Sequence, residues 1–258
     1  MSIYISTGIT IYFSVLAFLF GTVMGSFLNC MAYRIAHGQD WTKGRSHCPD
    51  CGHPLGFLDL FPIFSWLFLG GKCRYCGKKI SPRYPLTELF FGLVTLACLL
   101  RFDLTVLCLR NFIFICCLFT LSLVDLESYI IPNGSLVVAA VAWAVTEPFL
   151  FEGWPDLGLH IFAAVLYGVG IMAVSLIMDR VLKKESLGGG DVKLFAVVGL
   201  YFGLIGGLFA MIIACVLGLV ISLAARRNKI PFGPAIAAAC LVMVFFGQGL
   251  VSWYTGLF

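Results

Sequence analysis

The chain has 258 residues, of which 60% are hydrophobic and only 12% are charged. This composition is far from that of a soluble globular domain and excludes a water-soluble fold for most of the chain. The formal net charge of +4 does not by itself indicate a nucleic-acid partner. Because a membrane-spanning helix needs about 20 apolar residues, the sequence predicts an all-α polytopic membrane protein.

Hydropathy predicts eight membrane spans. The first begins near Ile9, and because no Lys or Arg precedes it, it lacks the basic segment of a signal peptide and is predicted to be retained. In chain order the predicted spans cover Ile9 to Ala36, Leu86 to Leu100, Leu104 to Val124, Ser135 to Phe151, Leu159 to Leu182, Val192 to Tyr201, Leu208 to Ala225 and Gly233 to Tyr254.

The sixth and seventh spans are separated only by a predicted break. The apolar stretch from Val192 to Ala225 has 34 residues, and as one helix it would be about 51 Å long, more than one crossing requires. Glycine clusters interrupt helices. The sequence FGLIGG, Phe202 to Gly207, therefore predicts a break between a short helix and one of ordinary length.

The distribution of basic residues tests this topology separately, because cytoplasmic loops are enriched in Lys and Arg. With the N-terminus outside, only Arg101 and Arg110 of the 17 basic residues fall away from the cytoplasmic loops and the adjoining helix ends. The loop from His37 to Pro85 is then cytoplasmic, and the acidic loop from Thr146 to Gly158 is outside. Without a break near Gly206, the basic stretch ARRNK would face outside, so the charges favour eight spans over seven.

A soluble element is predicted between the first two spans. It carries two CxxC pairs, CPDCGH and CRYCGK, whose cysteines are Cys48, Cys51, Cys73 and Cys76. A glycine follows each pair and lets the backbone fold tightly enough for amide groups to reach the thiolates. Four thiolates on two such knuckles fit a structural, tetrahedral Zn²⁺ site. The alternatives are two disulfides or a set of inert thiols, and a reducing cytoplasmic location argues against disulfides.

Two acidic residues lie at the ends of predicted spans, where carboxylates are costly. Asp125 ends the third span in DLESYIIPN, and Asp191 begins the sixth in SLGGGDVKLFAVVG. Gly188, Gly189 and Gly190 would let the chain turn and let another backbone pass close by, with Asp191 facing Asp125. One could then accept a proton from water while the other, protonated, polarises a peptide carbonyl, which is aspartic proteolysis. The alternative is that Asp191 caps a helix N-terminus and Asp125 only marks the end of a span.

The order of these motifs resembles the type IV prepilin peptidase family over nearly the whole chain. The similar stretches are GSFLNCMAYR, SHCPDCGHPL, GKCRYCGKKISPRYPLTELFFG, DLESYIIPN, GGGDVKLFA and PFGPAIA. One departure is LDLFPIFSW, Leu58 to Trp66, where the family usually reads ENIP before the serine. The resemblance implies that Asp125 and Asp191 are the catalytic pair.

The resemblance also implies a bifunctional enzyme of the bacterial inner membrane. A short, positively charged leader would be cleaved from prepilins or pseudopilins at the cytoplasmic face, and the new N-terminus would be methylated with S-adenosylmethionine. No nucleotide-type fingerprint is recognisable, because GGGD follows a helical span and not a strand, so no residues are predicted to bind the methyl donor. No nucleic acid is expected as a partner, and the oligomeric state stays open.

Three parts of the chain are expected. They are a first transmembrane helix at residues 1–36, a cytoplasmic four-cysteine zinc-binding domain associated with methyl transfer at 37–85, and a membrane aspartic peptidase domain at 86–258. Two rival functions stay open. A proton- or cation-coupled transporter would use Asp125 and Asp191 as a relay, although no convincing internal repeat is found. A peptidase-only relative would lack the cysteine domain, which this chain retains.

Overall fold

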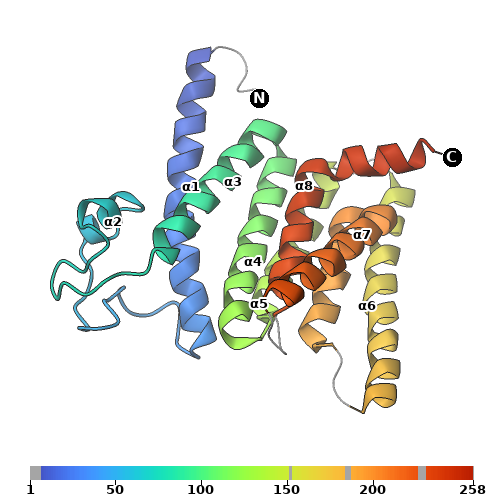
Figure 1. Ribbon diagram of the computed structural model, residues 1–258. Helices are drawn as coiled ribbons and strands as arrows, with labels where there is room; N and C mark the ends of the chain where they lie inside the picture. The colour runs from blue at the N-terminus through green and yellow to red at the C-terminus, as the bar shows by residue number, and fades with distance from the viewer. Residues whose placement is uncertain (1–6, 151–152, 184–186, 226–230, 258) are drawn as a thin grey trace. The chain divides into compact units, whose positions relative to one another are not determined.

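The regular structure of this protein is almost entirely helical (Figure 1). The computed structural model describes residues 7–150, 153–183, 187–225 and 231–257. Within these ranges the only β structure is two isolated bridges, His47 with Pro54 and Lys72 with Lys79, so the all-α prediction is confirmed. In chain order the helices are α1 (Thr7–Ala36), η1 (Phe57–Asp59), α2 (Phe64–Phe68), α3 (Arg83–Phe102), α4 (Val106–Ser128), α5 (Asn133–Leu150), α6 (Trp154–Leu182), α7 (Gly189–Ala225) and α8 (Gly233–Thr255).

Seven helices in the described part of the chain are long and apolar enough to cross a membrane, where the sequence predicts eight spans. The difference lies in α7, which covers both the sixth and the seventh predicted span. Gly203, in the middle of α7, has the non-helical angles φ 63° and ψ −162°. This position falls within the predicted break, so α7 consists of two helical arms joined by a kink (Figure 1).

The chain forms two compact units, Met1–Cys108 and Leu109–Phe258. In the first unit α1 and α3 pack closely, because small residues let helix backbones approach. A Cβ added at Gly25 of α1 would lie only 2.9 Å from the Cβ of Phe91 on α3. A little further along the same interface, the side-chain amide of Asn29 donates a hydrogen bond to the hydroxyl of Thr87.

The second unit has an apolar core to which α4, α5, α6, α7 and α8 all contribute. On α7, Leu194, Val198 and Tyr201 recur at helical spacing and are buried on one face. The ring of Tyr201 stacks on Phe114 of α4 with 3.8 Å between ring centroids. The hydroxyl of Tyr201 donates to the carbonyl of Ala139 on α5 at 2.8 Å, so one side chain joins three helices.

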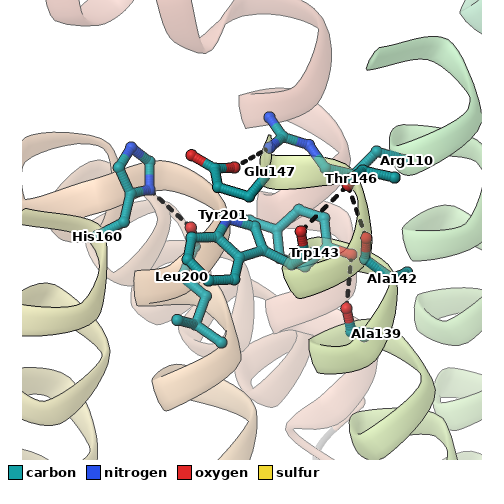
Figure 2. A network of polar contacts seen from close by, with 9 residues as sticks. All are labelled: Arg110, Ala139, Ala142, Trp143, Thr146, Glu147, His160, Leu200 and Tyr201. Atoms are coloured by element: carbon teal, nitrogen blue, oxygen red, sulfur yellow. Dashed lines mark hydrogen bonds and ion pairs between the residues drawn. The ribbon is translucent and has the colours of Figure 1, made fainter. Parts of the chain in front are cut away.

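The kink in α7 is held by two polar side chains of α6. Nδ1 of His160 donates to the carbonyl oxygen of Leu200 at 2.7 Å (Figure 2), and the hydroxyl of Tyr167 donates to the carbonyl oxygen of Leu204. Only glycine readily adopts the backbone angles found at Gly203. The two bonds reach α7 on either side of this residue and so fix both arms of the kink against α6.

A buried ion pair lies in the same region of the second unit (Figure 2). Nη1 of Arg110 on α4 lies 2.7 Å from Oε2 of Glu147 on α5, and both side chains are largely buried. Arg110 is one of the two basic residues that fall away from the predicted cytoplasmic loops. Its ion pair with Glu147 explains how its charge can be buried, because a buried charge requires a partner. The sequence predicts an outer loop that begins at Thr146, but Thr146 and Glu147 both lie within α5. Lys184, Arg226, Arg227 and Lys229, which contribute to the predicted cytoplasmic charge, lie outside the described residues.

Candidate active site

Asp125 lies in the last turn of α4, and its residue is only 4% exposed. The helix ends at Ser128, and Tyr129 follows with φ 56°, a left-handed conformation that commonly terminates helices. The N–H of Tyr129 donates to the carbonyl oxygen of Asp125 at 3.0 Å. After a short connection α5 begins at Asn133, so the DLESYIIPN motif forms the tight turn between two helices.

The N-terminus of α8 provides the partner of the Asp125 carboxylate. The backbone N–H of Gly233 donates to Oδ2 of Asp125 at 2.8 Å. The first N–H groups of a helix have no acceptor within the helix, and the helix dipole favours a negative charge there. The next residue, Pro234, has no N–H that would need a partner. A Cβ added at Gly233 would lie 2.7 Å from the same Oδ2, so this position has no room for a side chain.

Asp191 lies in the first turn of α7, which begins at Gly189. Its N–H donates to the carbonyl oxygen of Gly188 at 3.0 Å. The Asp191 carboxylate lies beside Gly188, since a Cβ added there would be 3.4 Å from its Oδ2, and Asp125 lies within electrostatic range of it. The fold therefore brings together two acidic residues from separate helices, one at the end of α4 and one at the start of α7.

The glycines before Asp191 do not form the turn that the sequence suggests. Gly189 and Gly190 already belong to α7, and none of the three glycines has a positive φ. The close approach of another segment, which the sequence also predicts, does occur at Gly190, since a Cβ there would lie 2.8 Å from the Cβ of Ile131 in the α4–α5 connection. Nearby, Nζ of Lys193 donates to the side-chain oxygen of Asn133 at 3.0 Å. These contacts fix the start of α7 against the turn that follows Asp125.

Sequence reasoning did not identify Gly233, Ile131 or Lys193 as site residues. The PFGP motif carries a signal, because a glycine next to a proline at a helix start leaves an exposed backbone donor. Its acceptor, however, is Asp125, 108 residues away in the chain. Only the packing of α8 against α4 identifies that pair.

The four-cysteine element of the first unit consists of two knuckles with the same hydrogen-bond pattern. In the first knuckle Cys48 N–H donates to His53 O at 3.0 Å, and Gly52 N–H donates to Cys48 O at 2.9 Å. The second repeats both bonds between Cys73, Gly77 and Lys78, at 2.8 and 2.9 Å. Both glycines have positive φ, 69° at Gly52 and 72° at Gly77, which explains why glycine follows each CxxC pair.

The sulfur atoms of the four-cysteine element lie close enough to share one ion. The Sγ atoms of Cys48, Cys51, Cys73 and Cys76 all lie within 4.8 Å of one another. Tetrahedral zinc with Zn–S bonds of about 2.3 Å would bring them to about 3.8 Å apart, and the Cys48 to Cys76 distance is 3.9 Å. Backbone N–H groups of Cys76 and Tyr75 lower the pKa of the Cys73 thiol to about 7, which favours the thiolate that a metal binds.

Removal of one thiol tests the metal assignment. The purified chain is expected to contain about one zinc per chain, and Cys48→Ser is expected to lose most of it and to make residues 37–85 more sensitive to protease. Cys215→Ser is the control, because Cys215 is an exposed cysteine of α7 outside the cluster, and its zinc content should equal that of the wild type. Elemental analysis measures both. Equal zinc in the two variants, or a disulfide within the cluster by mass spectrometry, would contradict the assignment.

Apolar helices that enclose a pair of interacting acidic side chains define a membrane protein with a carboxylate site. Aspartic proteases and ion-coupled transporters both use such sites. Comparison with known protein families distinguishes proteases from transporters. Residues 19–102 match the bacterial peptidase A24 N-terminal domain, and residues 112–223 match the type IV leader peptidase family.

Similar proteins come from several bacteria and carry the name prepilin leader peptidase/N-methyltransferase. The chain is 35% identical to one from Myxococcus xanthus over 83% of this chain and 65% of the relative. It is 32% identical to one from Bacillus subtilis over 92% of this chain and 96% of the relative. A third, from Aeromonas hydrophila, is 29% identical over 95% of this chain and 94% of the relative. No solved structure gave a significant match.

The chain belongs to the type IV leader peptidase family. Seven apolar helices and bacterial relatives indicate a multi-pass protein of the bacterial inner membrane. The predicted resemblance to prepilin peptidases is therefore confirmed, and the comparisons give no support to a transporter.

Proposed function

We propose that this protein removes the leader peptide from type IV prepilins or pseudopilins with Asp125 and Asp191 as its two catalytic carboxylates, and that it methylates the new N-terminus. Membership of the leader peptidase family and the names of the relatives support both reactions. The observation that supports the assignment of residues is the position of the two acids: the start of α8 bonds to Asp125 at the end of α4, and the start of α7, which carries Asp191, packs on Ile131 in the connection after α4.

In the proposed cleavage step, water attacks the carbonyl carbon of the scissile peptide bond. One carboxylate accepts a proton from the water, and the other, protonated, donates a hydrogen bond to the carbonyl oxygen. The tetrahedral intermediate then collapses, the C–N bond breaks, and the leaving nitrogen takes up the proton that the first carboxylate received. The Gly233 N–H supports this step by fixing the orientation of Asp125.

The close packing near the two carboxylates supports the proposal that the surrounding residues hold them in position. The close approach of Gly233 to Asp125 and of Gly190 to Ile131 leaves little freedom for the helix ends that carry the acids. Such precision matters because reacting groups must be held near the geometry of the transition state. If the two acids only marked the ends of spans, such close packing at the helix starts that carry Gly233 and Gly190 would not be needed.

We propose that residues 37–85 serve methyl transfer and that residues 86–258 form the peptidase. S-adenosylmethionine supplies the methyl group when it is bound, and no described side chain is assigned to it. With Cys48, Cys51, Cys73 and Cys76 holding zinc, all four ligand positions are filled by protein, so the metal would be structural and not catalytic. The excess of Lys and Arg supports a cytoplasmic location for residues 37–85 and an outside N-terminus.

One assay tests both reactions. The purified full-length chain is incubated with a model prepilin, with and without S-adenosylmethionine, and the product masses are measured. We expect loss of the leader in both samples and the addition of one methyl group only when the donor is present. Asp191→Asn should still methylate a substrate whose leader has already been removed, because the acid acts only in cleavage. A folded Asp191→Asn protein without methylation would instead indicate one shared active site.

A further inference from the structure

The first unit exposes a strip of apolar side chains that no other described segment of this unit covers. The strip runs from Phe57 to Phe68 and includes η1 and α2. Phe57 is 81% exposed, Leu58 is 70% exposed and Phe68 is 86% exposed. A shallow groove of about 310 Å³ lies among its side chains, and its lining is almost entirely apolar. An apolar surface of this size that stays exposed marks a contact with a partner or with lipid.

The strip presents no free charge, although it contains one acidic residue. Asp59 accepts hydrogen bonds from the N–H of Gly56 at 3.0 Å, from Nε of Arg74 at 2.7 Å and from the hydroxyl of Tyr75 at 3.1 Å. Its side chain is only 6% exposed. The carboxylate is thus neutralised and turned away, and the outward face of the strip is left to Phe and Leu side chains.

The charges around the strip have the sign that suits an anionic surface. Residues 37–82 carry three acids, and each is paired with a base: Asp40 with Lys43, Asp50 with Lys78, and Asp59 with Arg74. Arg45, Lys72 and Lys79 are additional exposed bases in this segment. Four thiolates with Zn²⁺ carry two formal negative charges, so with the metal bound a small positive surplus remains, which has the sign attracted to anionic lipid headgroups.

The strip also lies beside α3, level with the point where its apolar residues begin. The N–H of Ile63, next to α2, donates to Oε2 of Glu88 at 2.8 Å. Glu88 is five residues beyond the start of α3 at Arg83, a rise of about 7.5 Å along the helix. Figure 1 shows the same arrangement, with α2 beside the first turns of α3 and not beyond the end of α1.

The loop at residues 43–45, which contains Lys43 and Arg45, lies closer to the C-terminal end of α1 than the strip does. Asn29 of α1 contacts Thr87, which places it level with Glu88. Arg34 is five residues further toward the end of α1, about 7.5 Å away along the axis. Its guanidinium donates to the carbonyl oxygens of residues 43, 44 and 45 at 2.8, 3.1 and 3.2 Å. In membrane-interface segments, aromatic side chains lie near the bilayer and cationic side chains lie nearer to water.

We propose that the strip from Phe57 to Phe68 is an interfacial anchor, inserted among the lipids of the leaflet at this end of α1 and α3. The membrane is favoured over a protein partner because the position of the strip beside α3 and the sign of the surrounding charge both fit lipid. The anchor would hold the four-cysteine element, which continues directly from both ends of the strip, against the membrane surface. This contact concerns the surface of the first unit and does not depend on which reaction the protein catalyses.

Photo-crosslinking of the full-length chain in nanodiscs with phosphatidylglycerol tests the proposal. A benzophenone amino acid replaces Phe57 or Phe68 in turn, and the control replaces Lys43, an exposed residue of the loop around Arg34. We expect acyl-chain adducts, identified by mass spectrometry, to be several-fold more abundant at both strip positions than at Lys43. Both strip side chains are highly exposed, so the replacements should keep the zinc content of the wild type.

Other products would overturn the proposal. Crosslinks between two copies of the chain would make the strip a dimer interface. Crosslinks to an added prepilin in place of lipid would make it a substrate surface. Lipid adducts no more abundant at positions 57 and 68 than at 43, in variants with wild-type zinc content, would show that the strip faces water.

Discussion

Asp125→Asn and Asp191→Asn are each expected to reduce leader cleavage by at least about 100-fold, because each removes one member of an acid–base pair. The double variant should cost little more than either single one, since residues that act as a unit are not additive. The measurement is the initial rate of leader removal from a model prepilin, at equal amounts of folded enzyme.

The alternative role of Asp191 predicts a different result. The carboxylate lies in the first turn of α7, which is where an acid stabilises a helix. If this were its only function, Asn would cost at most about 1 kcal/mol of stability and leave cleavage largely intact. Substantial cleavage by Asp191→Asn would therefore reject the catalytic pair and support the helix-end role.

Gly233→Ala is expected to lower cleavage by about 100-fold, because a displacement of the reacting groups by about 1 Å is enough for such a loss. The added Cβ would lie 2.7 Å from Oδ2 of Asp125, so either the carboxylate or the start of α8 must move. Gly134→Ala is the matched control, since it is also in the first turn of a helix and a Cβ there meets nothing within 4 Å. Its rate should equal that of the wild type.

Two adjacent glycines on α7 give a second comparison within the same test. A Cβ at Gly190 would lie 2.8 Å from the Cβ of Ile131, whereas one at Gly189 meets nothing within 4 Å. Gly190→Ala should therefore slow cleavage and Gly189→Ala should not. Equal rates for the two variants, together with wild-type activity of Gly233→Ala, would show that close packing around the carboxylates is not needed for catalysis.

Much of the fold was predictable because membrane helices are determined by local composition. The apolar stretches predicted the spans, and the glycine cluster predicted the interruption of α7 that the structure has at Gly203. The number of helices was less predictable. The sequence indicates that a helix is interrupted, but whether the two arms separate or stay joined depends on tertiary contacts. Here His160 and Tyr167 of α6 bond to α7 on either side of Gly203.

The residues of the candidate site can be proposed from the sequence for a related reason. Acidic residues at the ends of apolar spans are conspicuous, so Asp125 and Asp191 could be named from the sequence. The role of the glycines was predicted only in part: another segment does approach Gly190 closely, but the expected turn is absent because the fold places Gly189 and Gly190 in a helix. What Gly190 provides is room for Ile131, and that need arises only when the α4–α5 connection packs against α7.

The sequence alone therefore determined the class of fold, the cysteine knuckles and the two acidic residues, because each depends on residue type and short spacing. The tertiary structure decided what surrounds them. It placed the N–H of Gly233 on Asp125, paired Arg110 with Glu147 and left the Phe57 to Phe68 strip exposed. The physical reason is that hydrogen bonds and close packing depend on distances in space between residues far apart in the chain, and those distances are set only when the helices pack.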